Sequence, residues 1–333
     1  DKKYKEAVAV AVKACAEDTK GQKCYICLEA VHARTGEGLV RGCACGDRDG
    51  VSSPELGVAH ASCLARQAKE LIAEGEDDNL DDKAMGERWE KWEKCSLCEQ
   101  HYHGVVACAL GWACWKTYVG RPATDTNRAD AMGNLGRSLG MVHHNEESLA
   151  VFEAHLAHHL RYAPGDRLSV LTARDNIATS YDNLGRRDEA LAMKREVHAG
   201  WLLYRGPADE ETIRAACNLG IVLTRSPANM TEAKALLRET IPVSLRALGP
   251  NHYHTLKIRM IYGDALCTAP DAPLEDCLEG ERILEDVLGR VRRIFGDQNP
   301  FTRQCQGWLT RARWKVGVHK GEADPFDEPI PCP

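Results

Sequence analysis

Several features that would narrow the function are missing from this sequence. Its longest apolar stretches, Ala7–Val12 and Gly104–Trp115, fall far short of the roughly 20 residues that a membrane-spanning helix needs. No run of Lys and Arg is dense enough to bind phosphates, and the formal net charge is −6. This balance argues against nucleic acid as the main partner. No secretory signal, lipidation motif or specific catalytic grouping of Asp, Glu and His emerges. We therefore expect neither a membrane span nor a conventional active site.

The length and composition are those of an ordinary soluble protein with more than one structural unit. A chain of 333 residues is too long for one compact core. Hydrophobic residues make up 44% and charged residues 28% of it, which is a usual balance for a globular protein. The first residue is Asp rather than Met. We therefore expect that a leading piece was removed, and that piece could have been an organellar leader.

Cysteine is abundant, and its distribution separates two interpretations. Fifteen cysteines could form a secreted disulfide framework or supply thiolates for metal in a reduced protein. In the first third of the chain most of them crowd in close pairs. Beyond it they are scattered through helical pattern, where a buried free thiol is ordinary. This profile favours metal binding in a reducing compartment, and we expect a cytoplasmic or nuclear location.

Four pairs of potential metal ligands lie within the first hundred residues. Zinc binds four nitrogen or sulfur ligands in a tetrahedron, and a two-residue gap lets one tight turn present two of them. Four pairs complete two closed sites, so we expect two zinc ions that hold the fold and do not activate water. Little periodic apolar pattern lies between the first and last pairs, and so small a module rarely folds on its core alone. The expected ligands are Cys24, Cys27, Cys43, Cys45, His60, Cys63, Cys95 and Cys98.

The order CxxC, CxC, HxxC, CxxC resembles the RING-CH variant of the RING finger, the metal-binding part of many ubiquitin ligases. The resemblance implies interleaved sites, in which the first and third pairs hold one zinc and the second and fourth pairs hold the other. It also implies that a ubiquitin-conjugating enzyme would contact Ile26 inside the first pair. A bulky apolar residue before the last pair, Trp89 or Trp92, would complete that contact.

Two departures from the family keep other interpretations open. Glu99 follows the eighth ligand, where many active RING ligases carry a cation, and Ser96 follows the seventh ligand, where proline is frequent. A PHD finger, which reads histone tails, shares the C4HC3 order. It usually has an aromatic residue two positions before the seventh ligand, where this chain has Glu93. The RING-CH interpretation is preferred.

From about residue 125 the chain repeats with a period close to 42 residues. Small residues recur at matched positions of expected helices, and Gly/Pro breaks separate the repeats. This combination is typical of stacked helical hairpins, because one hairpin alone cannot bury its apolar face. The recurring phrases are Asn134-Leu135-Gly136, Asn176-Ile177-Ala178, Asn218-Leu219-Gly220 and Ile261-Tyr262-Gly263.

The repeats resemble the tetratricopeptide repeats of kinesin light chains, notably in Tyr181–Arg186 and Leu248–His252. The resemblance implies that the first helix of each hairpin lines a groove for a bound peptide. Asn134, Asn176 and Asn218 match an Asn that can hydrogen-bond the peptide backbone there. The alternative is that these three residues bridge neighbouring helices.

These observations predict a mostly α-helical protein in which a small two-zinc cross-brace module precedes an α-solenoid of helical hairpins. We expect an N-terminal helix in 1–21, the zinc module in 22–103, a linker helix in 104–124, repeats in 125–317 and a tail in 318–333. Tryptophans of the linker helix should pack on the first repeat as a cap. The combination resembles a group of proteins from marine microalgae, which implies an architecture and no activity.

The expected function is protein interaction. The zinc module and repeats together suggest a RING-CH ubiquitin ligase whose repeats recruit the substrate, without a catalytic nucleophile of its own. The alternative is a non-catalytic scaffold or structural subunit that binds a protein partner through both parts, because fold resemblance alone is weak evidence of activity.

Overall fold

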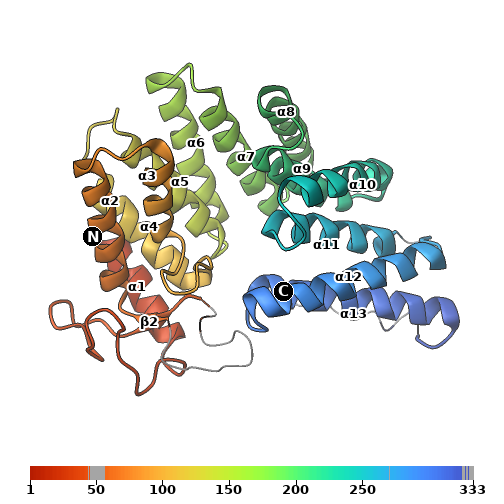
Figure 1. The fold of residues 1–333 in the computed structure, drawn as a ribbon, viewed down its shortest axis with the longest axis horizontal. Coiled ribbons are helices and arrows are strands. Elements are labelled where there is room, and N and C mark those ends of the chain that lie inside the picture. The colour runs from red at the N-terminus through yellow and green to blue at the C-terminus, as the bar shows by residue number, and fades with distance from the viewer. Residues whose placement is uncertain (44, 46–56, 270, 325–326, 328, 330–333) are drawn as a thin grey trace. The chain divides into compact units, whose positions relative to one another are not determined.

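The computed structural model describes residues 1–43, 45, 57–269, 271–324, 327 and 329. It divides into two compact units, Asp1–Leu184 and Gly185–Pro333. Helices dominate both of them (Figure 1). The first unit holds α1 Lys2–Ala14, β1 Val40–Arg41, β2 Val58–Ala59, α2 Ala61–Asp77, α3 Asp82–Trp89, the 3-10 helix η1 Glu90–Trp92, α4 Gly104–Tyr118, α5 Thr126–Gly140, α6 Asn145–Tyr162 and α7 Arg167–Asn183. The second holds α8 Arg187–Arg205, α9 Glu210–Thr224, η2 Pro227–Asn229, α10 Met230–Ala247, α11 Tyr253–Thr268, α12 Leu274–Phe295 and α13 Pro300–Lys320.

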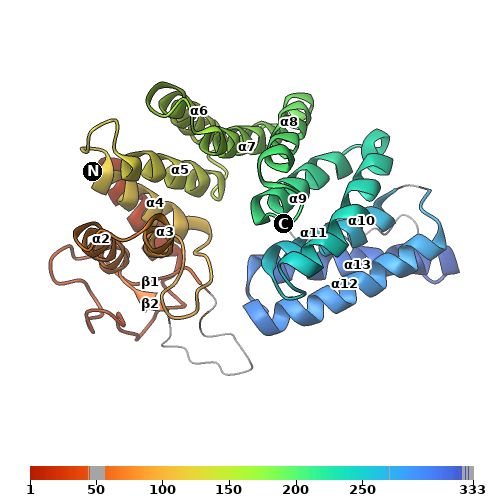
Figure 2. The ribbon, with the colours of Figure 1, turned by 45° about the horizontal axis from the view of Figure 1, so that its top comes forward.

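The N-terminal part of the first unit is built around a short antiparallel hairpin of β1 and β2 (Figure 2). Val40 pairs with Ala59 and Arg41 with Val58. Val40, Val58 and Ala59 are fully buried, in one core cluster with most of the candidate metal ligands. Helix α1 adds Val8 and Ala11 to this core, and it ends at Ala14, within the segment 1–21 where an N-terminal helix was expected.

Helix α2 was not predicted from the sequence, although it spans 17 residues. Its buried side chains include Leu64, Ala68 and Ile72, which are spaced four apart and therefore lie on one face. Alanine at the middle position gives a weak apolar signal, and Lys and Glu surround it. The apolar pattern between the first and last ligand pairs is thus more periodic than expected.

Helix α4 connects the zinc region to the repeats and packs against α1, α2 and α5. Its residues Val106 and Leu110 belong to the core around the candidate metal ligands. On another face, Trp112 and Trp115 pack against Leu139 of α5. The linker tryptophans therefore cover the first repeat as expected, and one buried helix is shared by both parts of the first unit.

Helical hairpins form the rest of each unit, with α5 to α7 in sequence in the first and α8 to α13 in the second. From α5 to α7, and from α8 to α13, each consecutive pair of helices is in contact. The recurring small residues sit where the two helices of a hairpin approach closely. A Cβ atom on Gly136 would lie 2.6 Å from Phe152, and one on Gly220 would lie 2.7 Å from Leu237.

The first helix of each repeat begins at a residue whose side chain accepts a hydrogen bond from a backbone N–H group in the first turn. Such capping satisfies donors that the helix itself leaves free. In the second unit a glycine with positive φ ends the preceding helix three residues earlier, at Gly206, Gly249 and Gly296, since only glycine adopts this conformation without strain. The capping residues are Asp125, Asp166, Asp209, His252 and Asn299.

The predicted fold class is confirmed: the chain is a mostly helical array of stacked hairpins, preceded by a region that holds two Cys/His clusters. Among the described residues, no helix combines the length and apolar character that crossing a membrane requires.

Candidate metal centre and repeat surface

The eight predicted ligands come together as two groups of four. Within each group, one donor atom from every residue lies within 4.8 Å of the others. The pairs are interleaved, so that the first and third form one group and the second and fourth form the other. We call Cys24, Cys27, His60 and Cys63 the first tetrad, and Cys43, Cys45, Cys95 and Cys98 the second tetrad.

Distances between donor atoms fit a metal ion at the centre of each tetrad. Zn–S bonds of about 2.3 Å in a tetrahedron place sulfur atoms about 3.8 Å apart, and a shorter Zn–N bond reduces that spacing. His60 Nδ1 lies 3.3 Å from Cys27 Sγ and 3.7 Å from Cys63 Sγ. In the second tetrad, Cys45 Sγ lies 3.4 Å from Cys95 Sγ. All cysteines in the described part of the chain are free thiols, so each tetrad could hold a metal ion.

The β-hairpin explains why the ligand pairs interleave. Strand β1 runs on through Gly42 to Cys43, whereas β2 runs on to His60. Because the strands are antiparallel, these two exits lie at opposite ends of the hairpin. Neighbouring segments of chain are therefore directed to different tetrads, and each tetrad must take its other ligands from elsewhere in the sequence.

The first and last ligand pairs are held by turns of the same geometry. In the first turn the Leu28 N–H donates to the Cys24 carbonyl over 2.8 Å, and Leu28 has φ +64°. In the second turn the Glu99 N–H donates to the Cys95 carbonyl over 2.8 Å, and Glu99 has φ +58°. Each pair therefore sits in a tight turn with a left-handed residue directly after its second cysteine. We call these two turns the knuckles.

The third pair lies at the start of α2, where His60 is the N-cap and Cys63 is in the first turn. The partial positive charge of a helix N-terminus favours a thiolate at Cys63. Burial lowers the pKa of His60, which keeps its imidazole neutral and thus able to ligate a metal.

In the second tetrad, hydrogen bonds from the other three thiols lower the pKa of Cys95, whereas hydrogen bonding to Cys45 raises the pKa of Cys43.

Gly57 is part of the second tetrad's surroundings and was not identified from the sequence. It has φ +77°, and a Cβ atom there would lie 2.9 Å from Cys43 Sγ and 3.0 Å from Cys45 Sγ. Only glycine meets both requirements. In the sequence, Gly57 is a single glycine six residues before Cys63 and belongs to no recognisable motif. The spacing of the ligands therefore could not identify it.

The residues predicted to contact a conjugating enzyme differ in accessibility. Ile26 is half-buried and packs against the core around the first tetrad. Trp89 is half-buried, and its ring meets Tyr118 edge to face at 5.1 Å. Trp92 is only 2% exposed and also packs against Tyr118. Trp92 is therefore a core residue rather than a surface contact, because α4 supplies a buried aromatic partner for it.

The three asparagines of the repeats lie on α5, α7 and α9 and have different surroundings. Asn134 is 7% exposed, and its amide donates to Glu93 over 3.4 Å. Asn176 is half-buried, and its amide nitrogen has no hydrogen-bond partner among the described residues. Asn218 is also half-buried. Ile261, the fourth matching residue, is 1% exposed and belongs to the core.

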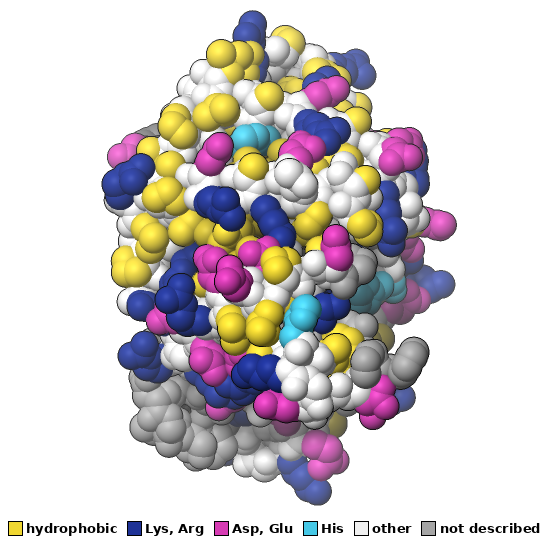
Figure 3. Space-filling model, turned by 90° about the vertical axis from the view of Figure 1, so that its right-hand side faces the viewer, with side chains coloured by type: hydrophobic (Ala, Val, Ile, Leu, Met, Phe, Trp, Pro, Cys, Tyr) yellow, Lys and Arg dark blue, Asp and Glu magenta, His cyan; other side chains and the backbone are white. Residues whose placement is uncertain are grey.

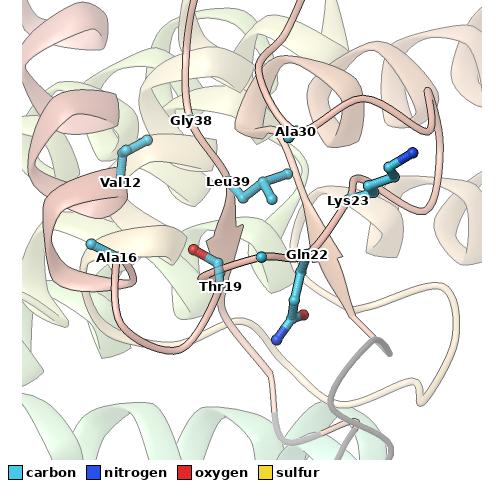
Figure 4. A pocket seen from close by; sticks show the side chains of 9 residues that line it. Val12, Ala16, Thr19, Gln22, Lys23, Ala30, Gly38 and Leu39 are labelled. Atoms are coloured by element: carbon cyan, nitrogen blue, oxygen red, sulfur yellow. The ribbon is translucent and has the colours of Figure 1, made fainter.

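The cavity beside α1 does not resemble an enzyme active site. Figure 4 shows a pocket of about 330 Å³ beside α1, with Val12, Leu39 and Lys23 in its lining. Its mainly aliphatic walls offer no convergent set of acid, base and nucleophile. On the face in Figure 3, acidic, basic and apolar side chains are interspersed, which is unlike the continuous positive area that nucleic-acid binding uses.

Comparisons with known proteins concern the repeats. A family model described as tetratricopeptide repeat matches residues 170–201 and 212–254. A solved structure of a kinesin light chain repeat protein from Podosopora anserina is 17% identical, with a TM-score of 0.47, and the alignment covers 61% of this chain and 92% of that one. BtubC (BKLC) from P. vanneervenii is 11% identical, with a TM-score of 0.47 and coverages of 79% and 85%. No curated protein matches the chain. The matched residues run from α7 to the first residues of α11, so the hairpins there are tetratricopeptide-like repeats, which are protein-interaction modules.

Proposed function

We propose that this protein is an interaction protein that holds two zinc ions and binds a protein or peptide partner through its repeats. The observation that carries the proposal is the tetratricopeptide match over residues 170–201 and 212–254, because stacked hairpins of this class present extended surfaces to partners. Metal bound in the two tetrads would stabilise the region that holds them.

Zinc is the ion proposed because the donors are thiolates and one imidazole in closed groups of four. Soft sulfur donors in a tetrahedron select zinc over magnesium or calcium, which prefer oxygen. With four protein ligands, neither ion keeps a position for water or substrate. Bound zinc would supply structural cross-links. One ion would be held by the first tetrad, Cys24, Cys27, His60 and Cys63, and the other by the second tetrad, Cys43, Cys45, Cys95 and Cys98.

The partner surface is proposed on the first helices of the hairpins. Asn176 on α7 has a buried amide nitrogen without a hydrogen-bond partner among the described residues, and it would pair with a peptide carbonyl once the side chain rotates toward the surface. Asn218 occupies the same register on α9. Asn134 is a weaker candidate because Glu93 already contacts its amide.

A second candidate function, RING-CH ubiquitin ligase, is supported by apolar residues on the knuckles. Leu28 and Leu97, one on each knuckle, are 68% and 48% exposed, and a docking site for a conjugating enzyme would need accessible apolar side chains at these turns. Ile26, two residues before Leu28, is partly exposed. Glu99 directly after the eighth ligand, and the burial of Trp92, count against this candidate relative to a scaffold.

One experiment tests both candidates. Elemental analysis of the purified full chain should give two zinc ions per molecule, and one ion or none would contradict the proposal. Ubiquitin transfer is then measured with a panel of conjugating enzymes for the wild type, Leu97→Ala, Ile26→Ala and Glu99→Arg. Leu97 is the cleaner probe, because its change removes exposed surface and should alter stability by less than about 0.5 kcal/mol.

The ligase candidate predicts transfer that Leu97→Ala and Ile26→Ala reduce and that Glu99→Arg increases, because a guanidinium can donate several fixed hydrogen bonds. If the wild type and Glu99→Arg are both inactive with every enzyme while two zinc ions are bound, the ligase is excluded and the scaffold stands.

A further inference from the structure

A short segment of the zinc region lies against the first helix of the repeat array. We call residues 89–93 the docking segment, and Asp130, Asn134 and Arg137 of α5 the α5 stripe. The stripe residues are four and three positions apart, so they lie on one helix face. The Trp89 side chain hydrogen-bonds Asp130. Arg137 and Asn134 both donate to the Glu93 carboxylate.

The docking segment is anchored by the second tetrad. The Glu93 carbonyl accepts a hydrogen bond from the Tyr102 N–H over 2.8 Å, and Lys94 bridges to His101. These contacts close the base of the hairpin whose tip is the second knuckle, and Glu93 is two residues from the ligand Cys95. A metal ion that fixes the knuckle would therefore also fix the Glu93 carboxylate against α5.

The same register of the next repeat has different chemistry. On α7 the equivalent residues are Thr172, Asn176 and Thr179, which carry no charge. The register is the one in which Asn176 and Asn218 are proposed to meet a partner. The docking segment thus covers, on α5, the face that the later repeats use for binding.

We propose that the docking segment is an internal ligand of the α5 stripe, held in place by the metal of the second tetrad. While metal is bound, the partner surface begins at α7. When that metal is lost, the α5 stripe becomes available to a peptide that carries an aromatic residue four positions before a carboxylate, as in the segment's own Trp89 and Glu93. This inference rests on the proposed function of the repeats.

The test uses the full chain and a fluorescent peptide with the sequence of residues 88–94, whose binding is followed by anisotropy. The variant Cys98→Ser weakens the second tetrad, and Glu93→Lys repels Arg137 while leaving all eight ligands intact. Both should bind the peptide at least about tenfold more tightly than the zinc-loaded wild type, as expected when an internal charge pair stops competing. Adding Arg137→Ala to either variant should remove the gain, whereas the matched change Thr179→Ala on α7 should not.

Equal peptide affinity for the wild type and Glu93→Lys, or no binding to any variant, would overturn the inference. So would a gain that survives Arg137→Ala. Zinc content measured on the same samples separates this result from the proposed function. Two zinc ions with unchanged peptide binding reject only the internal ligand, whereas a wild type without zinc rejects the proposed metal sites.

Discussion

At Gly57 the backbone and the ligands of the second tetrad leave no room for a side chain. A Cβ atom would meet two sulfur atoms at 2.9 Å and 3.0 Å, and φ is +77°. Gly36 has a similar φ of +71°, but nothing lies within 4 Å of its Cβ position. Comparing substitutions at Gly57 and Gly36 therefore distinguishes the effect of backbone strain from the effect of a collision with the ligands.

We predict that Gly57→Ala releases zinc from the second tetrad, whereas Gly36→Ala keeps both ions. Strain at positive φ alone should cost each variant about 1 kcal/mol, and the collision adds to this only at Gly57. Zinc stoichiometry and the thermal midpoint of each purified variant provide the measurement. Equal zinc loss in both variants would show that backbone strain, and not contact with the sulfur atoms, is the cause.

For single residues, the sequence predicts which side chains can bind metal better than it predicts which other residues each side chain contacts. The eight ligands follow from their spacing, since a metal needs specific donors on tight turns. Trp89 and Trp92 look equivalent in the sequence, and only the position of Tyr118 on α4 decides that Trp92 is buried. Contacts of that kind depend on an element that is distant in the chain.

Among the elements, the hairpin helices approach closely at some glycines and not at others. A Cβ atom on Gly220 of α9 would lie 2.7 Å from Leu237, whereas Gly289 of α12 is exposed, with nothing within 4 Å of its Cβ position. Overpacking typically costs about 1–3 kcal/mol. Replacing an unconstrained helical glycine with alanine gains about 0.5–1 kcal/mol.

The free energy of unfolding, measured in urea, should therefore change in opposite directions for two chemically identical substitutions. Gly220→Ala is expected to lower the free energy of unfolding and Gly289→Ala to raise it, because only the first introduces a collision between helices. If both variants were stabilised, the approach of α9 to α10 would be looser than described.

The sequence predicts the elements well where the chain repeats. A period near 42 residues reports the same hairpin several times, so small residues, breaks and caps reinforce one another. Helix α2 occurs once, and its face of Leu64, Ala68 and Ile72 was too weak a signal to stand out. Its start depends on the His60 ligand pair rather than on apolar periodicity.

For the molecule as a whole, metal should matter unequally to the two units. Both tetrads lie in the unit Asp1–Leu184. A structural zinc ion contributes on the order of 10 kcal/mol in small zinc peptides, which is comparable to the stability of a whole domain. Helix α4 shares its core with the ligands and with α5. Loss of metal should therefore unfold the zinc region and uncover the face of α5 that packs against it, while α5 keeps its contacts with α6.

Hydrogen exchange before and after treatment with a strong zinc chelator tests this prediction. Residues 22–43 and 57–118 should lose protection, α5 should lose part of it, and α9 to α13 should be unchanged, with recovery when zinc is added back. Equal loss of protection in both units would mean that metal supports the repeats in a way that the contacts described above do not explain.

In the second unit, each positive-φ glycine at a helix end is followed three residues later by a capping residue. This repeated arrangement determines how the chain can change in length. Arg205-Gly206-Pro207 and Leu248-Gly249-Pro250 are equivalent junctions, each with its own helix end before it and helix start after it. Deleting residues 206–248 would join Arg205 to Gly249 and keep a complete stop and start at the new junction. The array can therefore gain or lose whole hairpins by duplication or excision at these glycines, independently of the metal-binding region.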